Sequence, residues 1–230
     1  MPVDRTSPRT AVFLDALGTL VRLEQPWPAL VELLGERHGI PVAVEDARRA
    51  LLAEMAHYRR ECVRAFDAPS LAKLRRECAE IVRHELAGAL RALSDDELVA
   101  TLLDALRFAP YDDVTEALER WRAAGLTLVV VSNWDVSLHD VLRKTGLRVL
   151  LDGVVSSADV GRSKPDPAAF FAALELAGVQ ADQVVHIGDS LEEDVAGAQA
   201  AGIEAVLLHR GDDALDAPAD LRVIASLREW

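Results

Sequence analysis

The chain has 230 residues, of which 50% are hydrophobic, and carries a formal net charge of -13 at pH 7. This length suffices for one large core, or for a core and a smaller lobe. The acidic balance argues against nucleic acid and anionic membrane as partners, because both require a basic surface. The sequence has no apolar run long enough to cross a bilayer. We therefore expect a cytoplasmic protein whose two cysteines, Cys62 and Cys78, are reduced and buried.

The first predicted strand, residues 11–14, is a short apolar run that ends directly before Asp15 and a turn containing Gly18. Ligands of open α/β sheets bind just beyond the carboxyl ends of the strands. This position therefore favours a catalytic role for Asp15. The alternative is that its carboxylate caps the turn after a buried strand.

The next segment has apolar side chains at helical spacing and shows no alternation typical of strands. Ser94 and Glu97 have the spacing of a capping box, which marks the start of a helix. We expect helices over residues 27–38, 44–66, 71–93 and 98–106. Together they predict an all-helical lobe over residues 23–107, with hinges near residues 22–26 and 108–110.

From residue 109 onward, strand-like and helical patterns alternate. The predicted strands are mostly continuous apolar runs, as expected for strands buried on both faces. They span residues 126–131, 153–156, 183–187, 204–208 and 222–225, the last of which is a candidate edge strand. The intervening helices span residues 114–124, 136–145, 168–177 and 191–201. This alternation predicts right-handed βαβ units. We expect an α/β fold: a Rossmann-like parallel sheet flanked by helices, formed by residues 1–22 and 108–230, with the helical lobe as a second domain.

Polar residues directly follow the predicted strands. Ser132 and Asn133 follow one strand, Asp189 follows another with Asp194 five residues further on, and Lys164 precedes a helix. All of them would gather at the edge of the sheet that carries Asp15. Carboxylates are ligands for Mg²⁺, while a hydroxyl, an ammonium and backbone amides bind phosphoryl oxygens. Taken singly, each residue also has a simpler role, as a cap or a solvated charge.

In order and spacing, four segments resemble the four motifs of the haloacid dehalogenase-like (HAD) hydrolase superfamily. They are Asp15-Ala16-Leu17-Gly18-Thr19, Ser132-Asn133, Lys164-Pro165 and Gly188-Asp189-Ser190-x-x-x-Asp194. The resemblance spans nearly the whole chain, and the helical lobe resembles the mobile cap domain of that superfamily.

The resemblance implies a role for each matching residue. Asp15 would be the nucleophile, Asp189 a magnesium ligand beside it and Asp194 a further acidic support for the metal. The phosphoryl group would be bound by Ser132, Asn133 and Lys164, and catalysis would fall to Asp15, Ser132 and Lys164. The implied cofactor is Mg²⁺, and the implied substrate is a small anionic molecule. Both a monomer and a homodimer are compatible with the sequence.

One position departs from the family pattern. Phosphatases of this family usually place a second Asp two residues after the nucleophile, where it acts as general acid and base. Here that position is Leu17. The main-chain carbonyl of Leu17 can still face magnesium, but the proton donor is lost, and such a group is worth about 10²–10⁴-fold in rate.

The favoured function is a Mg²⁺-dependent phosphohydrolase that acts on a small phosphorylated metabolite through an aspartyl-phosphate at Asp15. The alternative is a 2-haloacid dehalogenase, in which Asp15 attacks carbon without a metal or a proton donor; Leu17 and Asp189 both depart from that pattern. A phosphonate hydrolase would need a cap lysine, for which Lys73 is the only candidate. A non-catalytic binding protein of the same fold has no need for Asp15, Lys164 and Asp189 together.

Overall fold

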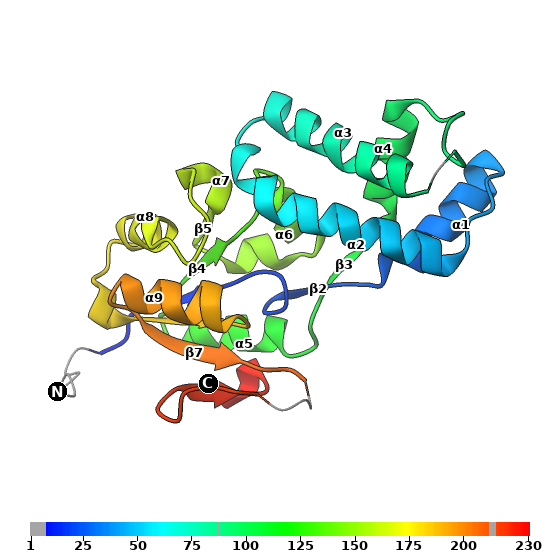
Figure 1. Cartoon of the computed structure of the whole chain (residues 1–230). Coiled ribbons are helices and arrows are strands. Elements are labelled where there is room, and N and C mark those ends of the chain that lie inside the picture. The colour runs from blue at the N-terminus through cyan, green and yellow to red at the C-terminus, as the bar shows by residue number, and fades with distance from the viewer. Residues whose placement is uncertain (1–7, 87, 212–214) are drawn as a thin grey trace. The chain divides into compact units, whose positions relative to one another are not determined.

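The computed structural model describes residues 8–86, 88–211 and 215–230. The chain divides into two compact units, which are described separately. The first unit combines Met1–Arg22 with Pro110–Trp230, and the second is Leu23–Ala109 (Figure 1). The chain passes between the units at two short strands, β2 (Val21–Leu23) and β3 (Phe108–Pro110), which pair with each other.

The first unit is built on a six-stranded sheet with the order β5-β4-β1-β6-β7-β8. Every pairing in this sheet is parallel. The strands are β1 (Ala11–Leu14), β4 (Thr127–Ser132), β5 (Gly153–Ser156), β6 (Val184–Gly188), β7 (Glu204–Leu208) and β8 (Arg222–Ile224). Strands β1 and β6 are buried along their whole length, as their continuous apolar runs predict. The α/β fold with a Rossmann-like parallel sheet is confirmed.

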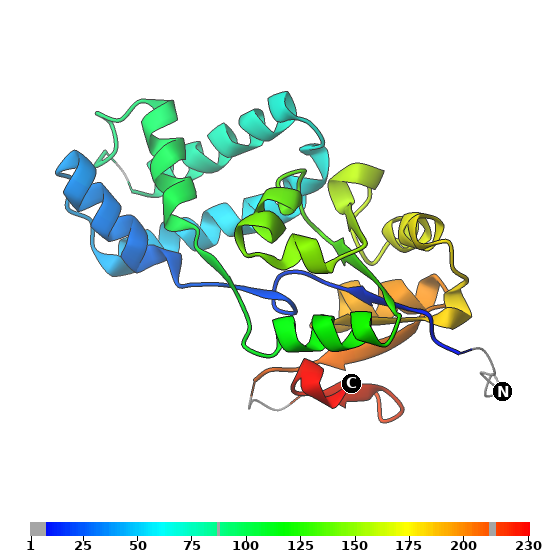
Figure 2. The ribbon, with the colours of Figure 1, turned by 180° about the vertical axis from the view of Figure 1, so that it is seen from behind.

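Helices cover both faces of this sheet. They are α5 (Val114–Ala123), α6 (Leu138–Lys144), α7 (Ser157–Val160), α8 (Ala168–Ala177) and α9 (Gly197–Ala200). Helices α8 and α9 lie on one face and α5 lies on the opposite face (Figures 1 and 2). On the first face, Phe13 of β1 packs in one hydrophobic cluster with Phe170 and Ala173 of α8. The alternation of side chains along β1 thus divides the core into two layers.

The second unit contains the helices α1 (Pro26–His38), α2 (Val44–Glu61), α3 (Ala68–Glu85) and α4 (Asp95–Ala105). The predicted capping box at the start of α4 is confirmed: the Ser94 hydroxyl accepts from the Glu97 N–H, and the Glu97 carboxylate accepts from the Ser94 N–H. Cys62 and Cys78 are buried thiols that are not joined in a disulfide, as expected. The core is aliphatic and includes Leu30, Leu34, Leu51, Val82 and Leu98. Among the described residues, none of the helices combines the length and apolarity of a membrane span.

Two predicted helices of this unit were too long. Helix α3 ends at Glu85 instead of residue 93, and turns follow it. Gly88 has a φ of +87°, a left-handed conformation that interrupts a helix. Leu90 and Leu93 are buried nevertheless, so their spacing imitates a continuing helix. Helix α2 likewise ends at Glu61, and a 3₁₀ turn follows over Cys62–Arg64.

Four further elements differ from the prediction. Strands β2 and β3 were not predicted, because three residues are too few to show an alternating pattern. The predicted helix over residues 191–201 is a π-helix, η4 (Leu191–Ala196), continued by α9. Helix α7, of four residues, was not predicted either. The other strands and helices of the first unit begin and end within two residues of the predicted positions.

A partly buried ion pair ties distant parts of the first unit together. The Asp113 carboxylate accepts from both terminal nitrogens of Arg210 at 3.0 Å, from the Ser226 hydroxyl at 2.7 Å and from the Leu227 N–H at 2.8 Å. Arg210 also donates to the carbonyl of Thr19, in the turn that follows Asp15. Burial alone would raise the pKa of Asp113, but the hydrogen bonds from Arg210 and Ser226 outweigh it and lower that pKa.

We expect Asp113→Ala to lower the free energy of unfolding by about 3 kcal/mol at pH 7, because it leaves the Arg210 charge without its partner. The pKa of Asp113 is lowered from 3.8, so its stabilisation is complete above pH 3.8 and is lost as the pH falls through the folded-state pKa. Urea unfolding at pH 7 and pH 3 measures both effects.

The matched control is Glu116→Ala, which breaks an exposed ion pair with Arg228. Exposed pairs contribute about 0–1 kcal/mol, so this change should cost far less. Equal losses for the two variants would contradict the structural role of Asp113.

Candidate active site

The carboxyl ends of three neighbouring strands present the predicted site residues. Asp15 directly follows β1, Ser132 is the last residue of β4, and Asp189 directly follows β6. Strand β1 lies between β4 and β6 and is parallel to both. All three residues are therefore delivered to one edge of the sheet, where open α/β sheets bind ligands.

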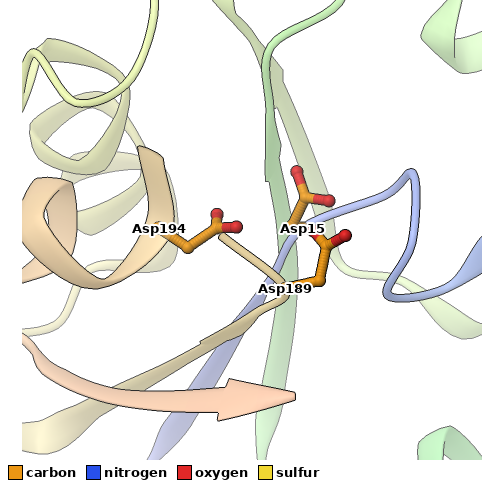
Figure 3. Close-up of side chains that lie close together, drawn as sticks. All are labelled: Asp15, Asp189 and Asp194. Carbon is orange, nitrogen blue, oxygen red and sulfur yellow. The ribbon is translucent and has the colours of Figure 1, made fainter. Parts of the chain in front are cut away.

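Three carboxylates meet at this edge. Asp15, Asp189 and Asp194 each offer one oxygen, and these atoms lie within 4.8 Å of one another. Figure 3 shows the three side chains directed toward one another, with Asp194 reaching in from η4. Asp15 and Asp194 are buried, whereas Asp189 is exposed. The structure thus brings together the acidic residues of the first and the last motif.

The Lys164 ammonium lies between two of these carboxylates. It donates to Asp15 Oδ1 at 2.7 Å, to Asp194 Oδ1 at 2.6 Å and to the Val131 carbonyl at 3.0 Å. These three bonds use all three of its N–H groups. The Ser132 hydroxyl also donates to Asp15 Oδ1, at 2.9 Å. Lys164 and Ser132 together therefore fix the orientation of the Asp15 carboxylate.

The charges at this edge shift one another's pKa values. Burial would lower the pKa of Lys164, but the charges of Asp15 and Asp194 raise it above its usual value, so the ammonium stays charged. Burial would raise the pKa of Asp194, but the Lys164 charge brings it below its usual range. Burial raises the pKa of Asp15, and Lys164 opposes this shift only in part.

Asp189 is the carboxyl that lacks a direct bond to the ammonium. Desolvation, followed by the negative charges of Asp15 and Asp194, raises its pKa to about 7. Ionisation of Asp189 is therefore opposed by its surroundings unless a cation joins the cluster.

The side chain of Asn133 holds the main chain of Lys164. Asn133 Oδ1 accepts from the Lys164 N–H at 2.7 Å, and Asn133 Nδ2 donates to the Lys164 carbonyl at 3.0 Å. Nδ2 also donates to the carboxylate of Glu193 at 2.9 Å. Both N–H groups of the amide are thereby used. A direct contact of Asn133 with a phosphate would therefore have to use its main-chain N–H.

Gly18 and Leu17 form the turn after the nucleophile candidate. Gly18 has a φ of +91°, and a Cβ at this position would lie 2.0 Å from Asp189 Oδ2, so the turn backbone passes directly against that carboxylate. The side chain of Leu17 is 37% exposed and brings no ionisable group to the turn. The proton donor that the family pattern places at this position is therefore absent from it.

Two polar residues at this edge gave no signal in the sequence. His186 is fully buried in β6 and lies with Nε2 2.8 Å from Asp194 Oδ1. Its neighbours Val185 and Ile187 are apolar, so the segment resembles any buried strand. Glu193, which bonds to Asn133, stands in an acidic run typical of the first turn of an exposed helix.

The carboxylate cluster fits a hard divalent cation. Magnesium prefers oxygen ligands, and the three acidic side chains supply them within a short distance of one another. When all three are ionised, the single ammonium of Lys164 leaves two negative charges in excess. A divalent cation would balance these two negative charges.

Asp189→Asn should change how the stability depends on pH in magnesium-free buffer. The folded-state pKa of about 7 exceeds the ordinary value of 3.8, so ionisation of Asp189 opposes folding. The cost is absent below pH 3.8, grows as the pH rises, and is complete above pH 7. We expect the variant to be more stable than the parent at pH 8 and equal to it at pH 3.5, by urea unfolding with EDTA. Asp220→Asn, which alters an exposed carboxylate, should show no such trend.

Comparisons with known proteins agree with this geometry. A family model described as haloacid dehalogenase-like hydrolase matches residues 10–202. Haloacid dehalogenase-like hydrolase domain-containing protein 3 of Danio rerio is 39% identical over 122 residues, which is 52% of this chain and only 50% of the relative. The phosphoserine phosphatase of Thermus thermophilus is 32% identical over 190 residues, which is 80% of this chain and 73% of the relative.

Two solved structures resemble the whole chain. A HAD phosphatase from Thermococcus onnurineus has a TM-score of 0.65 and 29% identity, covering 96% of this chain and 95% of the other. A 2-haloacid dehalogenase from Pseudomonas syringae has a TM-score of 0.64 and 26% identity, covering 96% of each. The resemblance inferred from the four motifs is thus confirmed: the chain belongs to the haloacid dehalogenase-like hydrolases.

Proposed function

We propose that this protein is a magnesium-dependent phosphohydrolase that acts on a small phosphorylated metabolite. The observation that carries the proposal is the cluster of Asp15, Asp189 and Asp194, whose oxygens lie within 4.8 Å of one another beside the Lys164 ammonium. A carbon-attacking enzyme that needs no metal has no use for the Asp189 carboxylate. The similarity to a phosphoserine phosphatase and to a HAD phosphatase supports the same choice.

Asp15 is the nucleophile in this proposal. One of its oxygens forms a bond to phosphorus while the bond from phosphorus to the leaving oxygen breaks, which gives an aspartyl-phosphate. Water then attacks the phosphorus, phosphate departs, and the Asp15 carboxylate is restored. Its bonds to Lys164 and Ser132 hold the carboxylate in place, so little orientation is lost when the substrate arrives.

Lys164 and Ser132 are also the proposed phosphate-binding groups, together with the main-chain N–H of Asn133. The ammonium and the hydroxyl donate to Asp15, Asp194 and the Val131 carbonyl, so a phosphoryl oxygen would accept from them by replacing one of these acceptors. The positive charge of the ammonium would act on the developing negative charge without that exchange. Asp15, Asp189 and the main-chain carbonyl of Leu17 would hold magnesium, with Asp194 as a further acidic support. The bound cation would supply positive charge against the phosphoryl oxygens.

The domain assignment belongs to this proposal. We assign residues 1–22 and 108–230 to the catalytic core and residues 23–107 to the cap domain. A cap of this kind would exclude water and select the substrate.

A 2-haloacid dehalogenase is the second candidate. Leu17 favours it, because the loss of halide from carbon needs no proton donor at this position. The similarity to the solved 2-haloacid dehalogenase is at the same level as that to the phosphatase. The dehalogenase chemistry leaves Asp189 without a role, which is why we place it second.

The direct test is turnover of p-nitrophenyl phosphate and acetyl phosphate, with magnesium or with EDTA, beside chloride release from 2-chloropropionate. We expect phosphate release that requires magnesium and is abolished by Asp15→Asn, because that change removes the nucleophile. Circular dichroism should show that the variant is folded. Chloride release in EDTA would establish the dehalogenase instead, and inactivity on all three compounds would favour a binding protein.

Leu17→Asp should restore the missing general acid. We expect phosphatase turnover to rise most for alkyl phosphates, by up to about 10²-fold, and least for p-nitrophenyl phosphate, whose leaving group needs no proton. Leu17→Asn is the matched control, because it has nearly the same shape as Asp and cannot donate a carboxyl proton. An equal rise in both variants, or no rise in either, would contradict the proposed deficit.

A further inference from the structure

His186 is a buried polar residue without an assigned role. It lies in the middle of β6, fully buried, with the edge of its ring against Phe170 at a centroid distance of 4.8 Å and an interplanar angle of 86°. Its Nε2 atom lies 2.8 Å from Asp194 Oδ1. Its Nδ1 atom is buried and has no hydrogen-bond partner among the described residues.

The contact with Asp194 requires a proton on the Nε2 atom of His186. Asp194 bonds to the Lys164 ammonium, which keeps the carboxylate ionised, so Oδ1 is an acceptor. His186 Nε2 must therefore be the donor. In the neutral ring this leaves Nδ1 as a buried acceptor without a partner, which is unfavourable for folding. An apolar side chain would avoid that cost, so stability alone does not explain a histidine here.

His186 is the far end of a continuous line of hydrogen bonds to the nucleophile. Asp194 Oδ1 accepts from His186 and from Lys164, and the second oxygen, Oδ2, accepts from the Ser190 N–H at 3.0 Å. Lys164 in turn donates to Asp15 Oδ1. Three donors thus fix the Asp194 carboxylate, and this carboxylate fixes the ammonium that holds Asp15.

We propose that His186 is a positioning residue: its Nε2–H orients Asp194 so that Asp194 holds the Lys164 ammonium against Asp15. The catalytic consequence rests on the proposed function, whereas the placement of Lys164 does not. Without the Nε2–H donor, Asp194 loses one of its three constraints, and the ammonium gains freedom to leave Asp15. Because Lys164 keeps its charge at the site while Asp15 loses its orientation, the expected loss is larger in the rate of the chemical step than in substrate affinity.

Two substitutions separate the hydrogen bond from the packing. His186→Gln keeps an N–H donor near the position of Nε2, whereas His186→Met fills similar space without a donor. We expect His186→Met to lower kcat for acetyl phosphate by at least about 10-fold with little change in KM. His186→Gln should recover most of this loss, although urea unfolding should find His186→Met as stable as His186→Gln or more so. His84→Met, at a side chain with 89% exposure, should match the parent.

A second readout needs no activity. The chain has three lysines, and the side chain of Lys164 is fully buried, whereas Lys73 and Lys144 are exposed and serve as internal references. Labelling by acetic anhydride in EDTA, followed by peptide mass spectrometry, measures how firmly Lys164 is held. We expect Lys164 to be protected in the parent and in His186→Gln, and to be labelled several-fold faster in His186→Met.

The outcomes decide between the roles. Unchanged kcat and unchanged protection of Lys164 in His186→Met would overturn the proposal. Equal losses in both variants, accompanied by equal losses of stability, would also overturn it, since they would indicate a packing role alone. If the parent hydrolyses no phosphate ester, the proposed function fails, and the labelling of Lys164 still decides whether His186 positions it.

Discussion

The candidate site depends on one buried ammonium shared by two carboxylates. Lys164 has no exposed side-chain surface, and its three N–H groups go to Asp15, Asp194 and the Val131 carbonyl. Placing three acidic groups side by side, two of them buried, would be strongly unfavourable without such a charge. Because the ammonium offsets only part of their charge, the cluster keeps an excess of negative charge. The same interaction therefore makes the cluster stable and makes it attractive to a cation.

The topology of the parallel sheet brings these groups together. Strands β4, β1 and β6 are adjacent, so residues far apart in the chain arrive at one edge without long loops. The framework behind that edge is rigid, since β1 and β6 are buried along their length. Rigid strands hold Asp15 and Asp189, whereas a loop carries Lys164. That loop needs the amide of Asn133 to fix its main chain.

Much of this arrangement could be predicted from the sequence, because local sequence patterns indicate it strongly. The continuous apolar runs before Asp15, after Gly125 and before Asp189 mark buried parallel strands, and polar residues that follow such strands share one edge. The interactions of Asn133 and His186 could not be predicted, because their partners are tertiary neighbours far away in the sequence. The position of a polar residue inside an apolar run does not identify its hydrogen-bond partner.

The predicted helix over residues 71–93 failed for a different reason. Leu90 and Leu93 are core residues at helical spacing, yet they lie in turns and not in a helix. Because buried turn residues can have the same spacing as a helix, the sequence pattern did not distinguish the two. The sequence pattern likewise did not distinguish the π-helix η4 from an α-helix. A one-residue change in hydrogen bonding leaves the apolar pattern nearly intact, although the Val195 N–H then donates to the Ser190 carbonyl five residues earlier.

The Asp113 network has a consequence for natural variation in this chain. Arg210 is shared between Asp113 and the carbonyl of Thr19, and Asp113 in turn is bonded to Ser226 and Leu227. The segment at the carboxyl terminus therefore braces the loop that carries the nucleophile candidate, although the two stand at opposite ends of the sequence. Inherited changes at Ser226, whose hydroxyl donates to Asp113, are thus better understood as changes to the support of the Asp15 loop than as remote surface variation.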